Sequence, residues 1–431
     1  MSQRYCILLL IGLIGLRLCA VENAAPMTLS LQEAEEMALK SHPKISVATL
    51  QALAAHEAEK GARATYFPTV AANVTAVGNR DDNTRLAAGF LNNPSVFERA
   101  AMGITVSQVI TDFGRTANLA ATARFNAKAS DQQMAVTRAQ IRLQTDLAYF
   151  AGLEALAFRR VATETVTSRQ RLFDQVSALA ANQLRSELDV SFARVSLNEG
   201  KLMLSSASNE VMAATARLEA LVGRASPAGF LLKEIESGGS VEVSAESLIS
   251  SALQNRPDLL QLRLQRDAAA RFSLAEKALS HPVISAMGGL GLIPIHDSRM
   301  QDSYAAAGVN LNLPLFTGGL YHARQREAEL KAAALEANLK DAENSVIRDV
   351  RIAWLSVNNA VERRKLSREL LENATKSFAL AQARYNAGSS SMVELGQAEL
   401  ARTSAEIALS NANYDLLAQE SLLSYQSGTW H

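Results

Sequence analysis

Hydrophobic residues follow two different periods along this chain, and the change of period separates the expected elements. Long tracts rich in Ala, Leu, Gln, Glu and Arg cover residues 116–182 and 320–386 without a proline. Such tracts are typical of helices. At 1.5 Å per residue each would reach on the order of 100 Å. Helices of this length must pack as a coiled coil or as staves of an extended assembly.

Four short stretches alternate with a period of two, which is typical of strands with one apolar face. In residues 308–315 every odd position is aliphatic, and every even position is small, polar or proline. Residues 70–76 and 104–107 repeat this alternation, whereas residues 284–292 are rich in glycine and give a weaker pattern. A small soluble sheet with one face on a core would show the same alternation.

The sequence also contains an internal repeat. Residues 30–43 resemble residues 244–257 at an offset of 214, and residues 101–110 resemble residues 306–315 at an offset of 205. Each half therefore reads as a short helix, a medium helix, two strands, a very long helix and a long helix. We expect a signal peptide over 1–20, a first repeat over 21–223 with strands near 69–78 and 102–110, a linker over 224–243, and a second repeat over 244–431 with strands near 283–292 and 305–315.

The first 20 residues have the features of an export signal, with an early Arg4 and a short apolar run. The run is too short to cross about 30 Å of hydrocarbon comfortably as a helix. Cys6 and Cys19 are the two cysteines of the chain, so the mature protein would contain no thiol. Because Arg17 and Leu18 precede Cys19, lipidation of Cys19 is the less favoured reading.

Composition excludes several classes of protein. The 43 basic and 43 acidic residues balance, which argues against a nucleic-acid partner. A hydrophobic content of 48% argues against disorder. We find no nucleophile elbow, no nucleotide loop and no pair of histidines at metal-ligand spacing, so we expect no enzyme activity, cofactor or metal site.

The strands favour a membrane location because they interrupt helices too long for a globule in an exported, duplicated chain. No apolar run of about 18 residues follows residue 20, so any membrane crossing must use strands. Four strands alone would leave unpaired backbone groups at an open edge in hydrocarbon. We therefore expect several copies of the chain to join.

These features together resemble the TolC-type outer-membrane efflux and secretion channels over nearly the whole mature chain. The resemblance rests on the duplicated openings at 30–43 and 244–257 and on three further motifs. They are Ser-Gln-Val-Ile-Thr-Asp-Phe-Gly-Arg at 107–115, Leu-Pro-Leu-Phe-Thr-Gly-Gly at 313–319, and Ala-Arg-Tyr-Asn-Ala-Gly-Ser-Ser-Ser-Met-Val-Glu-Leu at 383–395.

The resemblance implies a mainly helical homotrimer in the outer membrane of a Gram-negative bacterium. Each chain would give four strands to a 12-stranded β-barrel and its helices to a long periplasmic tunnel. Such channels work as passive conduits of tripartite efflux or type I secretion systems, docked to a periplasmic adaptor and an inner-membrane transporter. The alternative from another class is a soluble periplasmic coiled-coil adaptor or scaffold.

The resemblance also implies a gate at the periplasmic end. Tyr385 and Gly388 match the family's turn pattern, and Glu394 matches the first of two acidic residues that form carboxylate rings. Gln397 stands where the second acid would be, so one ring would be lost. In the first half Asp189 corresponds to Glu394, and Gln183 replaces the turn glycine. Alternatively, Glu394 is only a charge that stabilises the start of a helix.

Overall fold

The structure is a computed structural model that describes residues 27–78, 98–223, 230–235, 244–296, 298 and 301–430. The expected signal peptide over 1–20 lies outside the described residues. So do residues 224–229 and 236–243 of the expected linker.

Both halves contain two helices, two strands and two longer helices in the same order, which confirms the mainly helical, duplicated fold. The first half consists of α1 (Leu31–Ser41), α2 (Pro43–Ala64), β2 (Thr69–Val77), β3 (Arg99–Thr111), α3 (Arg115–Ala181) and α4 (Glu187–Val222). The second consists of α5 (Ala245–Asn255), α6 (Pro257–Lys277), the 3-10 turn η1 (Ala278–Ser280), β5 (Val283–His296), β6 (Ser303–Asn312), α7 (Leu320–Asn386) and α8 (Met392–Ser427).

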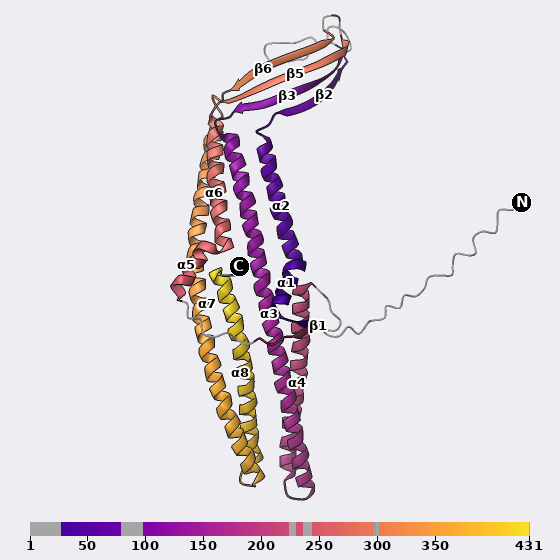
Figure 1. The fold of residues 1–431 in the computed structure, drawn as a ribbon, viewed down its shortest axis with the longest axis vertical. Helices are drawn as coiled ribbons and strands as arrows, with labels where there is room; N and C mark the ends of the chain where they lie inside the picture. Colours follow the sequence, from indigo (N-terminus) through magenta and orange to yellow (C-terminus); the bar gives the residue numbers. More distant parts are fainter. Residues whose placement is uncertain are drawn as a thin grey trace, which may run out of the picture.

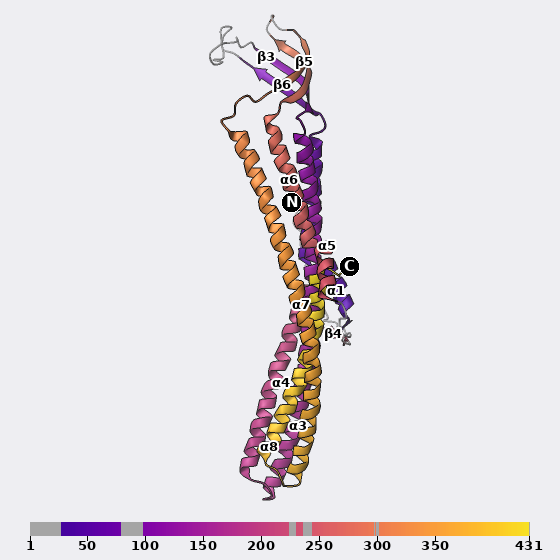
Figure 2. The ribbon, with the colours of Figure 1, turned by 90° about the vertical axis from the view of Figure 1, so that its left-hand side faces the viewer.

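The molecule is a long rod with the sheet at one end and two helical hairpins at the other (Figures 1 and 2). The first hairpin is formed by α3 and α4, and the second by α7 and α8. α3 and α7 have 67 residues each, which corresponds to about 100 Å. Between the sheet and the middle of the rod, α3 packs against α2 and α6. Towards the other end α3 packs against α4 and α8, and α7 follows α6 and then α8. None of the described helices has the length and hydropathy to cross a membrane.

Local signals set the starts of the shorter helices. Ser30 caps α1 in a capping box, in which its hydroxyl accepts from the Glu33 amide while the Glu33 carboxylate accepts from the Ser30 amide. Pro43 and Pro257 are the first residues of α2 and α6, where the missing amide hydrogen removes no helical bond. Both signals are local features that can be seen in the sequence.

The core is a series of small clusters along the rod, because helices packed side by side bury only narrow stripes. Many of the buried positions are alanines, which let the helices approach closely. The cluster at the middle contains Leu29, Tyr149 and Leu153. The Tyr149 hydroxyl lies 2.8 Å from the carbonyl oxygens of both Leu29 and Lys233, and so ties α3 to the two chain segments that cross it.

The two segments that cross α3 form a short parallel pair of strands that no sequence pattern predicted. β1 (Met27–Leu29) pairs with β4 (Phe230–Leu232), and β4 lies inside the expected linker. Three residues are too few to show a period. The strand expected near 305–315 was placed too late, since β6 covers Ser303–Asn312. Pro314 has no amide hydrogen for the sheet and lies beyond the strand's end.

Candidate functional site: a one-faced sheet and a helical tip

The four long strands form one antiparallel sheet in the order β2-β3-β5-β6. Residues paired across it include Val70 with Val106 and Ile104 with Leu290. Because paired residues point to the same side, the alternating apolar residues of the four strands share one face of the sheet. The middle pair joins the two halves of the chain, β3 to β5.

One face of this sheet is apolar and open. It is formed by large hydrophobic side chains from all four strands, namely Val70, Val74, Met102, Ile104, Val106, Leu290, Leu292, Val309 and Leu311. Val74 is 82% exposed and Val309 is 70% exposed within the single chain. A continuous apolar surface over a whole sheet is a surface that lipid or another apolar partner must cover.

The opposite face carries mainly small and polar residues, with Met287 and Tyr304 as larger side chains among them. Asn73 donates from Nδ2 to the Thr105 hydroxyl across β2 and β3 at 3.0 Å. The glycine-rich run at residues 288–291 lies within β5, where a Cβ on Gly291 would meet the Tyr304 ring at 2.6 Å. A strand that lies between lipid and water has one apolar side and one polar side.

Aromatic side chains gather where the strands meet the helices. Tyr66 and Phe67 lie between α2 and β2, and Phe113 and Phe316 follow β3 and β6. All four are exposed, with Phe316 at 90%. Such rings are typical of the boundary between a membrane and water. In this chain they lie at the junction of the sheet and the helices.

The second candidate region is the helical tip at the far end of the rod. Tyr385 is buried near the end of α7, and Gly388 takes the left-handed backbone of the following turn, with φ of 74°. The Arg185 guanidinium lies 4.4 Å from the centre of the Tyr385 ring and donates to the Tyr385 carbonyl at 3.0 Å. Burial raises the pKa of Tyr385, although the charge of Arg185 opposes the shift. Gln183 has the left-handed φ of 61° in the first hairpin, a strained value for a residue with a Cβ.

The acidic residues predicted for the tip serve the helix starts. Asp189 forms a capping box with Ser186 at the start of α4. At the start of α8 the Glu394 amide donates to the Ser391 hydroxyl, while the Glu394 carboxylate accepts from Arg384 and from Ser390, both at 2.7 Å. Gln397 is exposed one turn further along α8. The structure therefore brings Glu394 close to a cation, Arg384, which the sequence analysis did not single out.

Both halves of the chain match a known protein family. The profile of the "Outer membrane efflux protein" family matches residues 35–224 and 248–428, once in each half. This chain belongs to that family. It is 25% identical over 417 residues to "Outer membrane protein TolC" of Vibrio cholerae, covering 93% of this chain and 91% of that protein. It is 25% identical over 367 residues to "Solvent efflux pump outer membrane protein SrpC" of Pseudomonas putida, covering 83% and 76%.

Solved channel structures share the fold of this efflux family member. The outer-membrane channel OprN has a TM-score of 0.82 at 18% identity, over 92% of this chain and 89% of that chain. CusC, whose structures concern folding and transmembrane channel formation, has a TM-score of 0.81 at 18% identity, over 95% of each chain. The family consists of transport channels and not of enzymes. Within the described ranges no group of three or more His, Cys, Asp or Glu is arranged to hold a metal.

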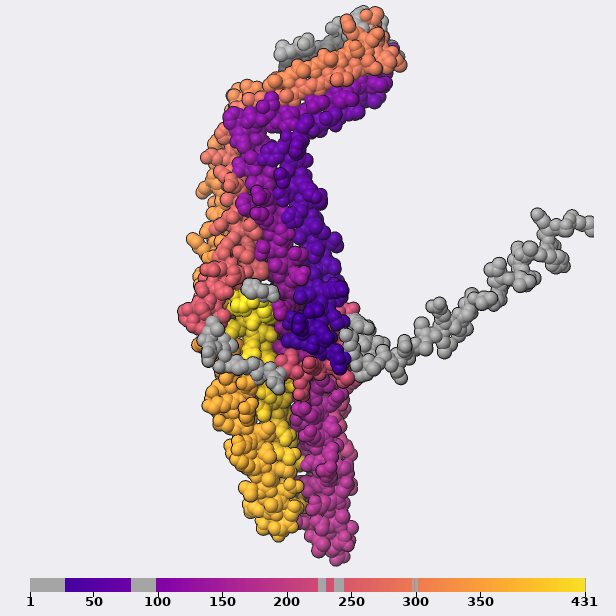
Figure 3. All heavy atoms as spheres, viewed as in Figure 1, coloured from indigo at the N-terminus to yellow at the C-terminus, as the bar shows by residue number. Residues whose placement is uncertain are grey.

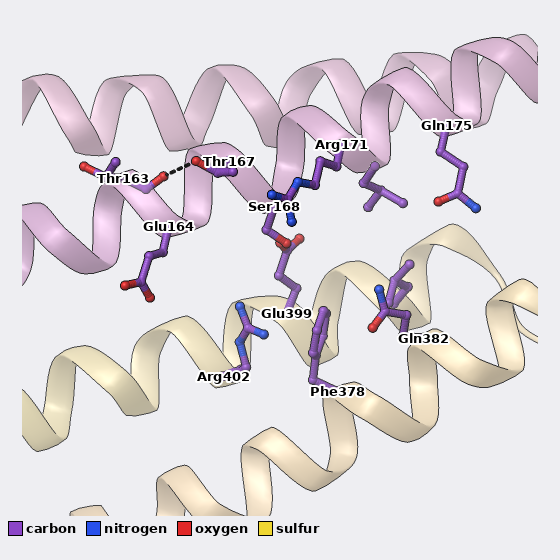
Figure 4. A pocket seen from close by; sticks show the side chains of 12 residues that line it. Thr163, Glu164, Thr167, Ser168, Arg171, Gln175, Phe378, Gln382, Glu399 and Arg402 are labelled. Carbon is purple, nitrogen blue, oxygen red and sulfur yellow. Dashed lines mark hydrogen bonds between the residues drawn. The ribbon is translucent and has the colours of Figure 1, made fainter.

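Between the two hairpins of this efflux protein lies a polar groove of about 520 Å³ (Figure 4). Glu399 projects from α8 towards Ser168 on α3, and Arg402 lies against the Phe378 ring at 4.3 Å. In the space-filling view the two hairpins are separate columns that meet along a furrow (Figure 3). No local pattern in the chain predicts this groove, because its residues come from distant segments.

A second buried carboxyl group lies at the middle of the rod. Asp146 of α3 is 3% exposed. Burial raises its pKa to about 8, and a hydrogen bond with Glu35 of α1 adds to the shift. Glu35 also pairs with Arg142, Nε to Oε2 at 2.9 Å. This cluster joins the first helix of the chain to the long helix α3.

Proposed function

We propose that three copies of this chain form a passive export channel in the outer membrane of a Gram-negative bacterium. Three sheets of four strands would close a 12-stranded β-barrel, and the helices would continue it as a tunnel in the periplasm. The observation that carries this proposal is the open apolar face shared by all four strands, on a sheet that has a polar opposite face.

The edges of the molecule support closure by identical copies. β2 and β6 end the described sheet, so each has one side without a strand partner among the described residues. An open edge in hydrocarbon leaves backbone groups without hydrogen bonds. If β6 of one copy pairs with β2 of the next, the interface is head-to-tail, and such an interface forms a ring when the rotation between copies closes.

We further propose that the tip faces a periplasmic adaptor, and through it an inner-membrane transporter, as in tripartite efflux or type I secretion systems. Tyr385, Gly388, Asp189, Glu394 and Gln397 would form the gate and docking region. The half-exposed position of Glu394 near the start of α8 and the two tight turns support this assignment. The channel itself would carry out no chemistry.

A charge on the apolar face tests the proposal. We expect Val309→Asp to prevent insertion into the outer membrane. A charged side chain on the lipid face costs about 2–4 kcal/mol at the bilayer midplane for Arg or Lys, and somewhat less for Asp. Asn310→Asp is the matched control, because the adjacent residue of β6 points to the opposite face. The measurement is the amount of heat-labile oligomer in detergent extracts of the outer membrane.

The rival reading is a soluble periplasmic scaffold in which the sheet is a docking surface. That reading predicts a soluble chain in the periplasmic fraction, with Val309→Asp and Asn310→Asp equally abundant there. A soluble wild-type monomer would refute the channel.

A further inference from the structure

A buried ion pair joins the two hairpins above the tip. Arg169 of α3 and Glu399 of α8 approach with Nε and Oε2 3.7 Å apart, and their side chains are only 8% and 2% exposed. Arg169 also donates from Nη1 to the Ser196 carbonyl of α4 at 2.7 Å. Its Nη1 lies 3.6 Å from the exposed carboxylate of Glu199. Arg169 thus connects α3, α4 and α8.

This pair is incompletely hydrogen-bonded. Glu399 Oε1, Arg169 Nε, Arg402 Nε and the Thr403 hydroxyl are buried without a hydrogen-bond partner among the described residues. Burial raises the pKa of Glu399, and Arg169 and Ser168 oppose that shift only in part. A buried ion pair lowers the free energy of the folded contact only when its remaining polar atoms are satisfied. Here the cost of removing the charges from water is not fully recovered.

We infer that Arg169 and Glu399 keep the contact between the hairpins weak enough to open, and so position the two hairpins for opening of the periplasmic tip. The inference rests on the proposed channel function, because only a channel needs this end to open. In the contacting state the two charges lie away from water. When the hairpins separate, water solvates both charges and recovers part of the cost of their burial.

Two features of the surroundings support this role. The polar groove beside Glu399, lined by Glu164, Ser168 and Arg171 among others, gives water a short route to the pair. On the other side, Gly200 of α4 leaves room for Arg169, since a Cβ at that position would lie 3.3 Å from Arg169 Cδ. The arginine is therefore placed by its neighbours and is not a surface charge that happens to be covered.

The inference predicts opposite effects for single and double replacements. Arg169→Met or Glu399→Met removes one charge and leaves the other buried without its main partner, which favours separation. The double variant with both methionines replaces the pair by apolar groups of similar length, which favours contact. A pair that simply holds the hairpins together would instead make the double variant separate as readily as the singles.

The test measures hairpin separation in the full chain purified from outer membranes. Nitroxide labels on Glu187→Cys and Asn386→Cys, one in each hairpin, report the separation by double electron–electron resonance over a urea series. The natural cysteines lie at positions 6 and 19, in the segment expected to be removed. At a fixed urea concentration we expect each single variant to raise the ratio of separated to contacting hairpins at least about tenfold, and the double variant to lower it at least about fivefold.

Two further variants keep the test specific: a control that should have no effect, and a variant that moves Arg169 without removing a charge. Glu372 and Lys376 form an exposed pair within α7 at 2.6 Å, so replacing both by methionine should leave the separation unchanged. Gly200→Ala keeps every charge but displaces Arg169, and should shift the ratio in the same direction as Arg169→Met. Circular dichroism of each variant shows whether the helices are folded.

The inference is overturned if the double variant separates as easily as the single variants, or if all of them match the wild type. Either result leaves the proposed channel untouched, because conduction of the wild-type chain in a planar bilayer is measured separately. Conversely, a chain that does not conduct but follows the predicted order of variants would refute the channel and keep the energetic account of the pair.

Discussion

At the residue scale, the charged side chains at the helical tip are tied into local contacts that reduce their effect on passing ions. Glu394 is the strongest candidate for a gate carboxylate, yet Arg384 lies 2.7 Å from it. The pair is about half exposed, so its strength is limited by solvent. The charge that an ion meets at this level would be the sum of both residues, and each can be changed alone.

We therefore expect opposite shifts from the two partners. Glu394→Gln should lower the preference for cations roughly twofold, and Arg384→Gln should raise it by a similar factor, because it uncovers the carboxylate. Reversal potentials of single channels under a salt gradient measure this preference. Unchanged selectivity in Glu394→Gln would show that Glu394 only stabilises the start of α8.

Asp146 gives a prediction for pH. Its folded-state pKa of about 8 lies above the ordinary value, which is about 3.9 in an unfolded chain. The folded state therefore holds a proton that the unfolded state releases, and stability should fall as pH rises from about 4 to about 8. Burial is the main cause, followed by the hydrogen bond and charge of Glu35, while Ser421 and Arg142 oppose it.

Asp146→Asn should flatten this decline, since the amide stays neutral at every pH. The thermal unfolding midpoint measured from pH 5 to pH 9 should fall less in the variant than in the wild type. Glu36→Gln, at an exposed position of α1, is the control and should keep the wild-type slope. If Asp146→Asn also kept that slope, the buried carboxyl would not be the source of the pH dependence.

The sequence predicted some of these residues and not others. Tyr385 and Gly388 belong to a local motif, and the structure places them in the tip. The partner of Tyr385 is Arg185, 200 positions earlier in the chain. The partner of Glu399 is Arg169, also in the other half. Such pairs depend on how two helices lie against each other, and a single sequence carries no period or spacing that reports it.

At the element scale, long periodic segments were predictable because each repeats one signal many times. The ends of α7 are those expected from the sequence, and α3 differs by one residue. Strands were predictable where aliphatic residues alternate, as in β6. In β5 three glycines, at 288, 289 and 291, weaken the alternation, and the strand extends to His296 beyond the expected end. The pairing of β3 with β5, which joins the halves, follows from the tertiary fold and from no local signal.

The outer sides of α4 and α7 carry apolar stripes with no cover in the single chain. On α4, Leu188, Val195 and Leu202 are exposed and recur every seven residues. On α7, Ile352, Leu366 and Leu380 are exposed and recur every fourteen. The seven-residue spacing on α4 is the pattern of a coiled-coil seam, whereas the spacing on α7 is twice as long. We propose that α7 of one copy packs against α4 of the next.

Leu366→Asp should weaken this association at least about tenfold, because a carboxylate would be buried in the seam. Asn358→Asp adds the same charge at an exposed position on another side of α7 and should leave assembly intact. Analytical ultracentrifugation of detergent-extracted protein measures the oligomer. Equal assembly of both variants would remove α7 from the interface.

At the scale of the whole molecule, the same lateral order holds along the entire rod. Near the tip the order is α4, α3, α8, α7, nearer the sheet it is α2, α3, α6, α7, and in the sheet it is β2, β3, β5, β6. First-half elements therefore occupy one side and second-half elements the other at every level (Figure 1). One head-to-tail contact can serve the sheet and the helices together, which is the simplest way to continue a barrel into a tunnel.

The most direct test of the proposed trimeric channel is the mass of the particle extracted from outer membranes, measured together with its conductance in a planar bilayer. We predict three copies of the chain per particle and one conducting pore per particle. A single-chain particle, or a soluble monomer that forms no pore, would contradict it.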